Sequence, residues 1–481
     1  MSKKLTGGSA ADAAGPSAAL AGASPGQRAL RKLHGKMLRK ACPRSSHAGV
    51  ILGQGPRDPL LRLEQSNTDR VDKLLPVRFA RMAESPLAFF RGTAILQAHD
   101  LKSTPSAGIL VQCGGDCHLM NFGGFATPER ALVFDINDFD ETLPGPFEWD
   151  GKRLATSFVL AAHWLGFDRD AARQAAEAVV TSYRTNLARF ADMTVLETWY
   201  ARITMDELLQ EAAHDPGILK RLQKTVAKAT QNTSEHVFQR ITTLADGQLR
   251  IVDQPPLLFH ADPAERDLTR DLAPFFDGYR RTLSRDRQAL FERFHLVDAA
   301  YKVVGVGSVG TRCFIVLFAG DQDDHLFLQV KEARPSVLEG LAGPCPYDNN
   351  GERVVIGQRL MQSASDIFLG WSRGSDGRDY YVRQLRDMKV APDLAGYTPR
   401  VLAAHARLCG RTLARAHAKS GDAATITGYL GTKRTFDQAI ASYALAYADQ
   451  VEEDYESFRT AIEAGRFPIE TMPSEIEQSI P

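Results

Sequence analysis

Apolar residues recur at intervals of three and four through most of residues 62–296, which is the period of a helix with one buried face. One insert that is rich in Gly and Asp, residues 113–150, interrupts this pattern. The segments that show the helical period most clearly are RVDKLLPVRFARMAESP, GKRLATSFVLAAHWLGF, DAARQAAEAVVTSYRTNLARFADM and ITMDELLQEAAHD. We therefore predict a mainly helical lobe over residues 62–296, and we expect it to carry the insert.

The pattern changes near Val297 to short β-branched and aromatic runs separated by glycines, which is typical of strands. The strand-like text is YKVVGVGSVGTRCFIVLFAG, HLFLQVKEA, IFLGWS and YYVRQLR, with the helical segment GERVVIGQRLMQSAS in its middle. A helical period returns after Pro399. We therefore predict the α+β class, with a small β-rich lobe at residues 297–392 inserted between the helical lobe and C-terminal helices at residues 393–481.

The N-terminal part of the chain differs in composition from the rest. Residues 1–61 are rich in Ala, Gly, Ser and Pro and include a basic stretch from Arg28 to Arg44. Such a composition is typical of a flexible N-terminal arm, which we predict over residues 1–61. The alternative is a basic helix that touches a partner or an acidic surface.

Composition and charge narrow the function classes. Of the 481 residues, 44% are hydrophobic and 24% are charged, as in a globular protein. The 58 Lys and Arg balance the 58 Asp and Glu, so we expect no nucleic-acid partner, because nonspecific binding needs an excess of positive charge. Without a run of about 18 apolar residues we expect no membrane insertion. The six sparse cysteines suit reduced thiols, and we predict a cytoplasmic location.

The insert begins with the motif CGGDCHLMNFG. Two glycines place the carboxylate of Asp116 on a tight turn. His118 can brace that turn, and Asn121 offers an amide oxygen shortly after Asp116. A metal site made from His118 and the neighbouring cysteines would need paired ligand spacings, so we expect packing and loop shaping from the cysteines.

A second motif, ALVFDINDFDE, follows the first one. It runs apolar up to Phe134 and then carries Asp135, Asn137, Asp138, Asp140 and Glu141. Side by side, like charges repel one another unless a cation or a positive side chain lies between them. Hard oxygen ligands of this kind suit Mg²⁺. The alternative is a solvated acidic turn.

The third motif is a glycine loop between two strand-like runs. It contains Gly305, Gly307, Ser308 and Gly310, and Lys331 lies in the following strand FLQVKEA. Glycines let a backbone approach phosphate oxygens closely, and a lysine on a neighbouring strand supplies one fixed positive charge. The motif is no dinucleotide fingerprint, because a strand follows its last glycine, and no P-loop, because it lacks GK[ST]. A simple tight turn is the alternative reading.

Together these motifs resemble known phosphotransferases. GDCHLMN is similar to the GDxHxxN catalytic loop of the aminoglycoside and choline phosphotransferases, VFDINDFDE is similar to their metal-binding segment, and the glycine loop with Lys331 resembles the amino-terminal lobe of kinases. Kinases carry the glycine loop before the catalytic loop, whereas here it follows. The resemblance therefore implies a circularly permuted, two-lobed protein-kinase-like fold.

Residues 70–465 also resemble a bacterial group, domain-of-unknown-function family 2252. The resemblance rests on FFRGTA, GGDCHLMNFGG, NDFDET, VGVGSVGTR, QVKEARPSVLE and GERVVIGQRLMQ. These segments are spread over most of the chain, so the resemblance is nearly full length.

The kinase resemblance implies roles for the residues of the insert. Asp116 would accept or orient the proton of an attacking hydroxyl, and His118 would brace its turn. Asn121 and Asp138 would hold magnesium, and Asp135 competes with Asp138 for that role. Asp116, His118, Asn121 and Asp138 form the predicted catalytic set.

The same resemblance gives Lys331 the role of neutralising phosphates while it pairs with a helical glutamate. Two glutamates are candidates: Glu339 follows Lys331 closely, whereas Glu352 lies farther along the chain. A loop and a helical turn need the longer spacing, so we favour Glu352. With the glycine loop, Lys331 and Glu352 form the predicted nucleotide-binding set.

We therefore expect a phosphotransferase that uses ATP and Mg²⁺ and acts on a hydroxyl group of an unidentified, small-molecule substrate. Three alternatives stay open. The first is a nucleotide-binding pseudokinase or partner-binding module, which would be expected to have lost some of Asp116, Asn121, Asp138 and Lys331. The second is transfer of a nucleotidyl group to a protein, and the third is a metal-dependent hydrolase that leaves the glycine loop unexplained.

Overall fold

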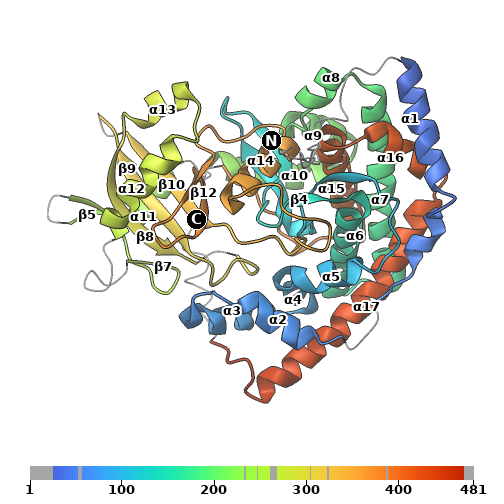
Figure 1. The fold of residues 1–481 in the computed structure, drawn as a ribbon, viewed down its shortest axis with the longest axis horizontal. Helices are drawn as coiled ribbons and strands as arrows, with labels where there is room; N and C mark the ends of the chain where they lie inside the picture. Colours follow the sequence, from blue (N-terminus) through green and yellow to red (C-terminus); the bar gives the residue numbers. More distant parts are fainter. Residues whose placement is uncertain are drawn as a thin grey trace, which may run out of the picture.

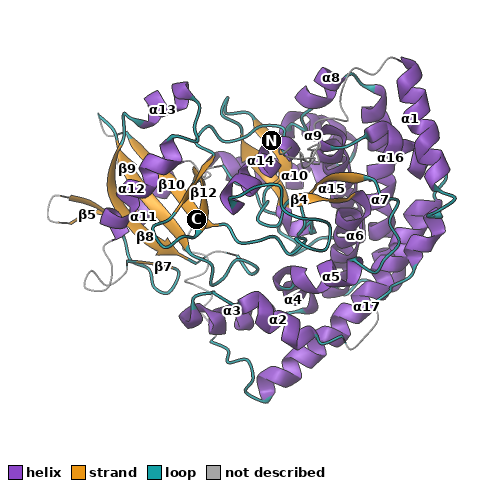
Figure 2. Ribbon diagram, in the orientation of Figure 1, coloured by secondary structure: helices purple, strands orange, loops and turns teal. Residues whose placement is uncertain are grey.

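The structure is a computed structural model, and it describes residues 25–470 apart from 53–56, 232–233, 246–247, 261–267, 304, 322–323 and 386–387. Figures 1 and 2 show the main sheet on the left and a group of long helices on the right; this sheet has six strands. Helices and strands are both abundant, and the largest sheet lies to one side of the group of long helices. The predicted α+β class is therefore confirmed.

The helical part is built around long helices that come from both ends of the chain. The central ones are α6 (Phe147–Trp164), α7 (Arg169–Asp192), α15 (Pro399–Ser420) and α17 (Thr435–Glu463), and each of them packs against α7 or α6. The Tyr183 hydroxyl on α7 meets Nδ1 of His417 on α15 at 2.9 Å. Segments that are distant in the sequence thus share one core.

Shorter helices surround this core. On the N-terminal side they are α1 (Pro25–Leu38), α2 (Pro59–Asn67), α3 (Leu75–Met82), α4 (Pro86–Gly92) and α5 (Ala94–Leu101); in the middle and C-terminal parts they are α8 (Val195–Tyr200), α9 (Met205–Glu211), α10 (Pro216–Gln231) and α16 (Ala423–Leu430). Helix α11 (Ser234–Ile241) lies instead beside the six-stranded sheet, where Phe238 stacks on His325. Among the helices in the described ranges, none combines the length and the hydropathy that crossing a bilayer requires.

The flexible arm that we expected over residues 1–61 is not what the structure shows from Pro25 onward. Helix α1 lies against α16, and Arg39 Nε, just after α1, donates to the carbonyl oxygen of Tyr429 at 2.8 Å. The two backbones meet closely, because a Cβ added at Gly35 would lie 1.9 Å from the carbonyl oxygen of Thr425. Glycines that suggest flexibility in the sequence here permit close packing. Residues 1–24 lie outside the described residues.

The sheet has the strand order β11-β12-β10-β9-β8-β7, and every neighbouring pair is antiparallel. Its strands are β7 (Leu258–Phe259), β8 (His295–Lys302), β9 (Cys313–Ala319), β10 (His325–Glu332), β11 (Gly370–Arg373) and β12 (Asp379–Gln384). The glycine loop joins β8 to β9, and Lys331 stands opposite Cys313 on one side and Tyr381 on the other.

Two helices, α12 (Leu268–Arg280) and α13 (Arg285–Phe291), cover one face of the sheet. Phe276 of α12 meets Phe318 of β9 edge to face, with ring centroids 4.9 Å apart. The sequence pattern grouped residues 258–296 with the helical lobe, yet they supply β7, α12, α13 and the start of β8. A helical period reveals a buried face, but it does not say which partner buries it.

Side chains alternate across the sheet. Val330 and Val382 belong to the core under α12 and α13. Their neighbours Lys331 and Tyr381 therefore point to the opposite face, toward the helical part. Helix α14 (Asn350–Met361) also lies there, between the sheet and α15.

The insert forms two small antiparallel pairs. Strand β1 (Leu110–Cys113) pairs with β4 (Leu143–Pro146), and β2 (Phe122–Ala126) pairs with β3 (Leu132–Ile136). A third pair, β5 (Thr242–Ala245) with β6 (Gln248–Ile251), lies elsewhere. The two pairs of the insert place its polar loops between the helical part and the sheet.

Candidate functional site

The loop after β1 is held in one position by Asp150 of α6. The N–H groups of Gly114 and Gly115 donate to the two carboxylate oxygens of Asp150 at 2.7 and 3.1 Å. His417 of α15 approaches the same carboxylate at 3.2 Å. Gly115 has φ +78°, and a Cβ there would lie 2.3 Å from the carbonyl oxygen of Glu141. Only glycine fits this close approach of the two polar loops.

Asp116 follows this turn, and its side chain is one-fifth exposed. Arg153 of α6 donates from Nε to Oδ1 of Asp116 at 2.6 Å. Burial raises the pKa of Asp116, although the charge of Arg153 opposes the shift. The Asn121 side chain donates to the carbonyl oxygen of Asp116 at 2.8 Å, so these two predicted residues lie together.

His118 is buried beside Asp116, with Nε2 3.7 Å from Oδ2 of that carboxylate. Burial first, and then the positive charges of Arg91 and Arg153, hold the pKa of His118 well below its usual range. The imidazole is therefore neutral. Its Nδ1 is buried without a hydrogen-bond partner among the described residues. The turn is held by the backbone of His118, whose N–H donates to the carbonyl oxygen of Asp116 at 2.9 Å.

Asp135 does not reach the same place. Its side chain is fully buried, and Oδ1 accepts from Arg415 of α15 at 2.6 Å. Oδ2 accepts from the N–H and the hydroxyl of Ser363 at 2.8 and 2.7 Å. Both carboxylate oxygens of Asp135 thus accept hydrogen bonds from buried groups of the protein, and the site of Asp135 is not open to a metal ion.

Asp138 and Asp140 lie in the turn after β3. Oδ1 of Asp138 accepts from the N–H of Asp140 at 3.1 Å. Burial, followed by the negative charge of Asp140, raises the pKa of Asp138. Asp140 contacts the sheet, because Oδ1 accepts from the Tyr381 hydroxyl at 2.8 Å and Oδ2 forms an ion pair with Lys331.

The Lys331 ion pair changes the pKa values of both partners. Burial alone would raise the pKa of Asp140, but Lys331, together with Tyr381 and Arg383, lowers it overall. Burial alone would lower the pKa of Lys331, but Asp140, together with Tyr381 and Asp138, raises it overall. Both groups are therefore charged at neutral pH.

The predicted pairing of Lys331 with Glu352 is not what the structure shows, since Lys331 pairs with Asp140. The N–H of Glu352 donates to the side chain of Asn349, which caps the start of α14, and Glu339 is exposed. The residue after Glu352, Arg353, faces the acidic turn and donates to the carbonyl oxygen of Asp140 at 2.8 Å. The partner of Lys331 thus comes from the turn that Arg353 holds.

Arginines anchor the glycine loop through its carbonyl oxygens. Arg78 of α3 donates to the oxygens of Val306 and Gly307 at 2.9 and 2.7 Å, and Arg81 contacts the oxygen of Gly305. The oxygen of Gly310 accepts from the N–H of Val71 at 2.8 Å. The loop is therefore tied to the N-terminal helices, although these come much earlier in the sequence.

Ser308 at the tip of the loop donates to Oδ2 of Asp140 at 3.1 Å. The acidic turn also meets the loop that carries Asp116 and Asn121, because the N–H of Asn137 donates to the carbonyl oxygen of Asn121 at 2.8 Å. The charge of Asp140 in addition contributes to the raised pKa of Asp116. Three segments consequently meet at one place.

We call this place the junction, and define it as Asp116 and Asn121, Asp138 and Asp140, and Ser308, Lys331 and Tyr381. Of the predicted site residues, the junction brings together Asp116, Asn121, Asp138, Ser308 and Lys331. Asp135 and Glu352 lie outside it.

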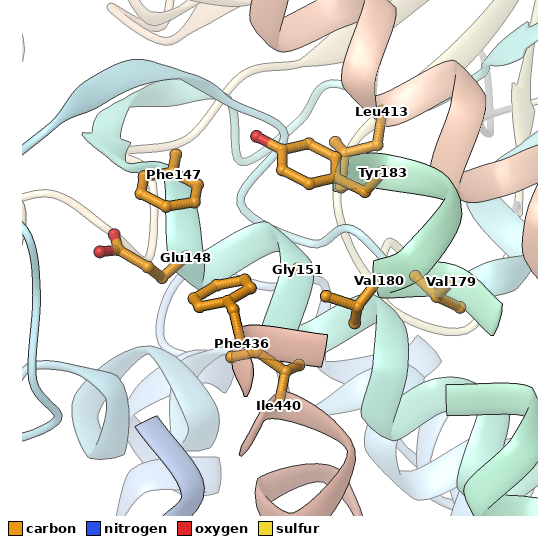
Figure 3. Close-up of a pocket in the computed structure, with 9 residues that line it drawn as sticks. All are labelled: Phe147, Glu148, Gly151, Val179, Val180, Tyr183, Leu413, Phe436 and Ile440. Carbon is orange, nitrogen blue, oxygen red and sulfur yellow. The ribbon is translucent and has the colours of Figure 1, made fainter. Parts of the chain in front are cut away.

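A cavity in the helical part is a separate feature (Figure 3). It has a volume of about 10 Å³, room for about one water molecule, and Phe147, Glu148, Tyr183 and Phe436 are among its lining residues. Burial raises the pKa of Glu148 to about 7. The cavity is too small for a substrate, so the junction is the better candidate site.

Residues 70–461 match the model of a family described as "Uncharacterized protein conserved in bacteria (DUF2252)". The chain belongs to this family. No curated protein and no solved structure matches the chain. The part of the chain shared with the family contains the whole junction, as well as α14 and α15.

Within this shared part, the sequence pattern did not single out several residues that shape the junction. Asp140 was one of several carboxylates, Tyr381 was one of two tyrosines on a strand, and Arg153 was one of many helical arginines. Asp140 and Lys331 are 191 residues apart in the sequence. The signal that could have found Tyr381 is the alternation of side chains along β12, because the tyrosine paired with Lys331 must share its face of the sheet.

Proposed function

We propose that the protein is an ATP- and Mg²⁺-dependent phosphotransferase that acts on a hydroxyl group of a small molecule. The observation that supports this most is the contact of Asp140 with both Ser308 and Lys331. It joins a glycine loop, a strand lysine and an acidic turn next to Asp116. These are the parts that phosphoryl transfer by kinases needs in one place.

The order of the elements supports a circularly permuted two-lobed kinase-like fold as part of the same proposal. The hairpin β8–β9 carries the glycine loop, β10 carries Lys331, α14 follows, and β11 and β12 complete the sheet. In this proposal the residues before the sheet supply the catalytic and metal-binding loops, and α15 to α17 complete the helical lobe.

The junction residues fit a magnesium ion held together with a nucleotide. Within the described residues, no three His, Cys, Asp or Glu side chains converge on one metal position. Mg²⁺ is commonly bound by one or two carboxylates plus substrate phosphates and water. Asp138 and the amide oxygen of Asn121 would hold the ion, with Asp140 beside them. Burial, followed by the charge of Asp140, raises the pKa of Asp138, and a bound cation would stabilise the charged carboxylate. When bound, the ion neutralises phosphate charge.

The other residues hold the reactants and the proton. Lys331 exchanges part of its contact with Asp140 for a phosphate oxygen, and the glycine loop covers the phosphates. Asp116 accepts the hydroxyl proton as the new O–P bond forms and the bond to the leaving phosphate breaks. Arg153 fixes the orientation of Asp116, while burial raises the pKa of the carboxyl and makes it a better proton acceptor.

A thermal-shift series with ATP, with and without Mg²⁺, tests the proposal. Binding to the folded state contributes about 2.7 kcal/mol at one hundred times the dissociation constant. We expect the melting temperature to rise with ATP and to rise further with Mg²⁺. The absence of any shift at millimolar nucleotide, in a preparation that melts cooperatively, would remove the proposal.

A further inference from the structure

Arg91, the penultimate residue of α4, lies between the catalytic loop and the glycine loop. Its neighbour Phe90 accepts a hydrogen bond from Arg153 at 3.0 Å, and Arg153 also holds Asp116. Its other neighbour, Gly92, accepts one from Arg78 at 2.7 Å, and Arg78 also holds the glycine loop. The backbone of Arg91 is therefore fixed from both sides.

The contact with the glycine loop is also direct. A Cβ added at Gly307 would lie 3.2 Å from the carbonyl oxygen of Arg91. The hydrogen bond of Arg153 to the carbonyl oxygen of Phe90 holds Arg91 beside the loop of Asp116, and in keeping with this the charge of Arg91 acts on the pKa of both Asp116 and His118. Arg91 thus stands at the place where the end of a phosphate chain under the glycine loop would meet a hydroxyl at Asp116.

The guanidinium of Arg91 makes no hydrogen bond and no ion pair within the described part of the chain, and its Nε is buried. The other arginines around the junction are all engaged: Arg78 and Arg353 bind backbone carbonyls, and Arg153 binds Asp116. A half-buried charge without a partner is unfavourable for the ligand-free fold.

We propose that Arg91 binds the terminal phosphate of the nucleotide, the group that is transferred. This inference rests on the proposed function and adds to it the residue that distinguishes a triphosphate from a diphosphate. A guanidinium with a fork of N–H donors suits phosphate oxygens, and a phosphate would supply the acceptors that the protein does not. Lys331 and the glycine loop, by contrast, bind the phosphates that ATP and ADP have in common.

The test compares the wild type with Arg91→Gln, Arg91→Lys and the control Arg62→Gln. Arg62 lies on α2, where it bonds Gln65 at the surface, so its loss removes the same charge away from the junction. Calorimetric titration measures the affinities for Mg-ATP and Mg-ADP. Arg91→Gln should lower the affinity for ATP by about 10- to 100-fold, and that for ADP by less than about threefold. Arg62→Gln should change neither.

The ligand-free melting temperature separates a binding role from a structural one. Since Arg91 has no partner among the described residues, Arg91→Gln should melt at or above the wild-type temperature. A marked decrease for both Arg91→Gln and Arg91→Lys would assign the residue to the fold and overturn the inference. So would wild-type ATP affinity in folded Arg91→Gln, and in that case the proposed function would still stand.

If the wild type binds no nucleotide, the proposed function fails, and inorganic tripolyphosphate then tests Arg91 separately. Stabilisation of the wild type by tripolyphosphate that is absent in Arg91→Gln would support an anion site at Arg91. Equal response of the two proteins, or none from either, would overturn it.

Discussion

Two ion pairs that begin in the same acidic motif have different surroundings. The first, Asp135 with Arg415, has side chains that are 0% and 1% exposed, and Ser363 fills the remaining acceptor positions. We call it the inner pair. The second, Asp140 with Lys331, leaves one-quarter of the aspartate side chain exposed and includes groups from the sheet and the glycine loop. We call it the junction pair.

The difference shows how two aspartates of one motif can differ in their access to solvent and in their partners. The inner pair joins β3 to α15, and its acceptors are used up within the protein. The junction pair joins parts that the chain brings together from distant segments, and its carboxylate remains accessible from one side. A charge with such access can exchange one partner for a ligand, whereas the inner charge can only keep the one that it has.

Breaking the inner pair should produce the largest effect on stability. Asp135→Ala leaves the Arg415 guanidinium buried without its anion, which typically lowers the free energy of unfolding by about 3–5 kcal/mol. Urea denaturation measures the loss. Asp449→Ala, which breaks an exposed pair with Arg169, is the control and should change stability by less than about 1 kcal/mol. Similar values for the two variants would contradict our assignment of the inner pair.

Asp116→Asn should act on turnover and leave the fold intact. The amide can still accept the hydrogen bond from Arg153, but it cannot take up the hydroxyl proton. Loss of a positioned base lowers kcat by about 10²- to 10⁴-fold. The measurement is ATP turnover with the acceptor substrate once identified, with nucleotide affinity as the control. A variant that has lost nucleotide binding would place Asp116 among the binding groups instead.

Lys331→Met should weaken nucleotide binding and destabilise the protein much less than Asp135→Ala does. The side chain keeps its length, and Asp140 retains Tyr381, Ser308 and access to solvent. We expect ATP affinity to fall by about 10- to 100-fold, since a charge-assisted contact to phosphate is lost. Titration calorimetry and urea denaturation together check this. A stability loss as large as that of Asp135→Ala would show that the junction pair, too, is structural.

Local patterns predicted the elements of the junction better than they predicted its contacts. The strand with Lys331 and the helix GERVVIGQRLM appear as β10 and α14 because each has a period that the sequence displays. Asp138 was chosen for magnesium from the resemblance, with Asp135 as its competitor, and the contacts of Asp140 were not predicted, because side chains in an irregular turn follow no period. Their surroundings come from segments that are distant in the sequence. The choice of Glu352 failed for the same reason, since spacing along the chain does not reveal a partner 191 residues earlier.

The smallest expected effect comes from Asp138→Asn, and it has a definite dependence on pH. The raised pKa of Asp138 means that the folded state holds this proton more tightly than the unfolded chain does. Ionisation of Asp138 therefore destabilises the fold progressively as pH rises from the unfolded pKa through the folded one. The variant lacks this penalty. Its free energy of unfolding relative to that of the wild type should therefore increase with pH, from the value found below about pH 4 to a gain of less than about 1 kcal/mol at neutral pH.

Asp140→Asn provides the opposite case. Because the pKa of Asp140 is lowered in the folded state, its ionisation stabilises the fold at pH values above the pKa of the unfolded chain. This stabilisation is lost as the pH falls through the pKa of the folded state. Asp140→Asn should therefore be destabilising at neutral pH and less destabilising in acid. Denaturation curves of both variants between about pH 2.5 and about pH 8 measure these slopes.

Asp138→Asn should also lose the Mg²⁺-dependent part of nucleotide stabilisation, because the amide keeps the shape but not the charge that holds the cation. Slopes of the same sign in both variants would contradict the assigned electrostatics, and an unchanged Mg²⁺ dependence in Asp138→Asn would exclude Asp138 as the metal ligand.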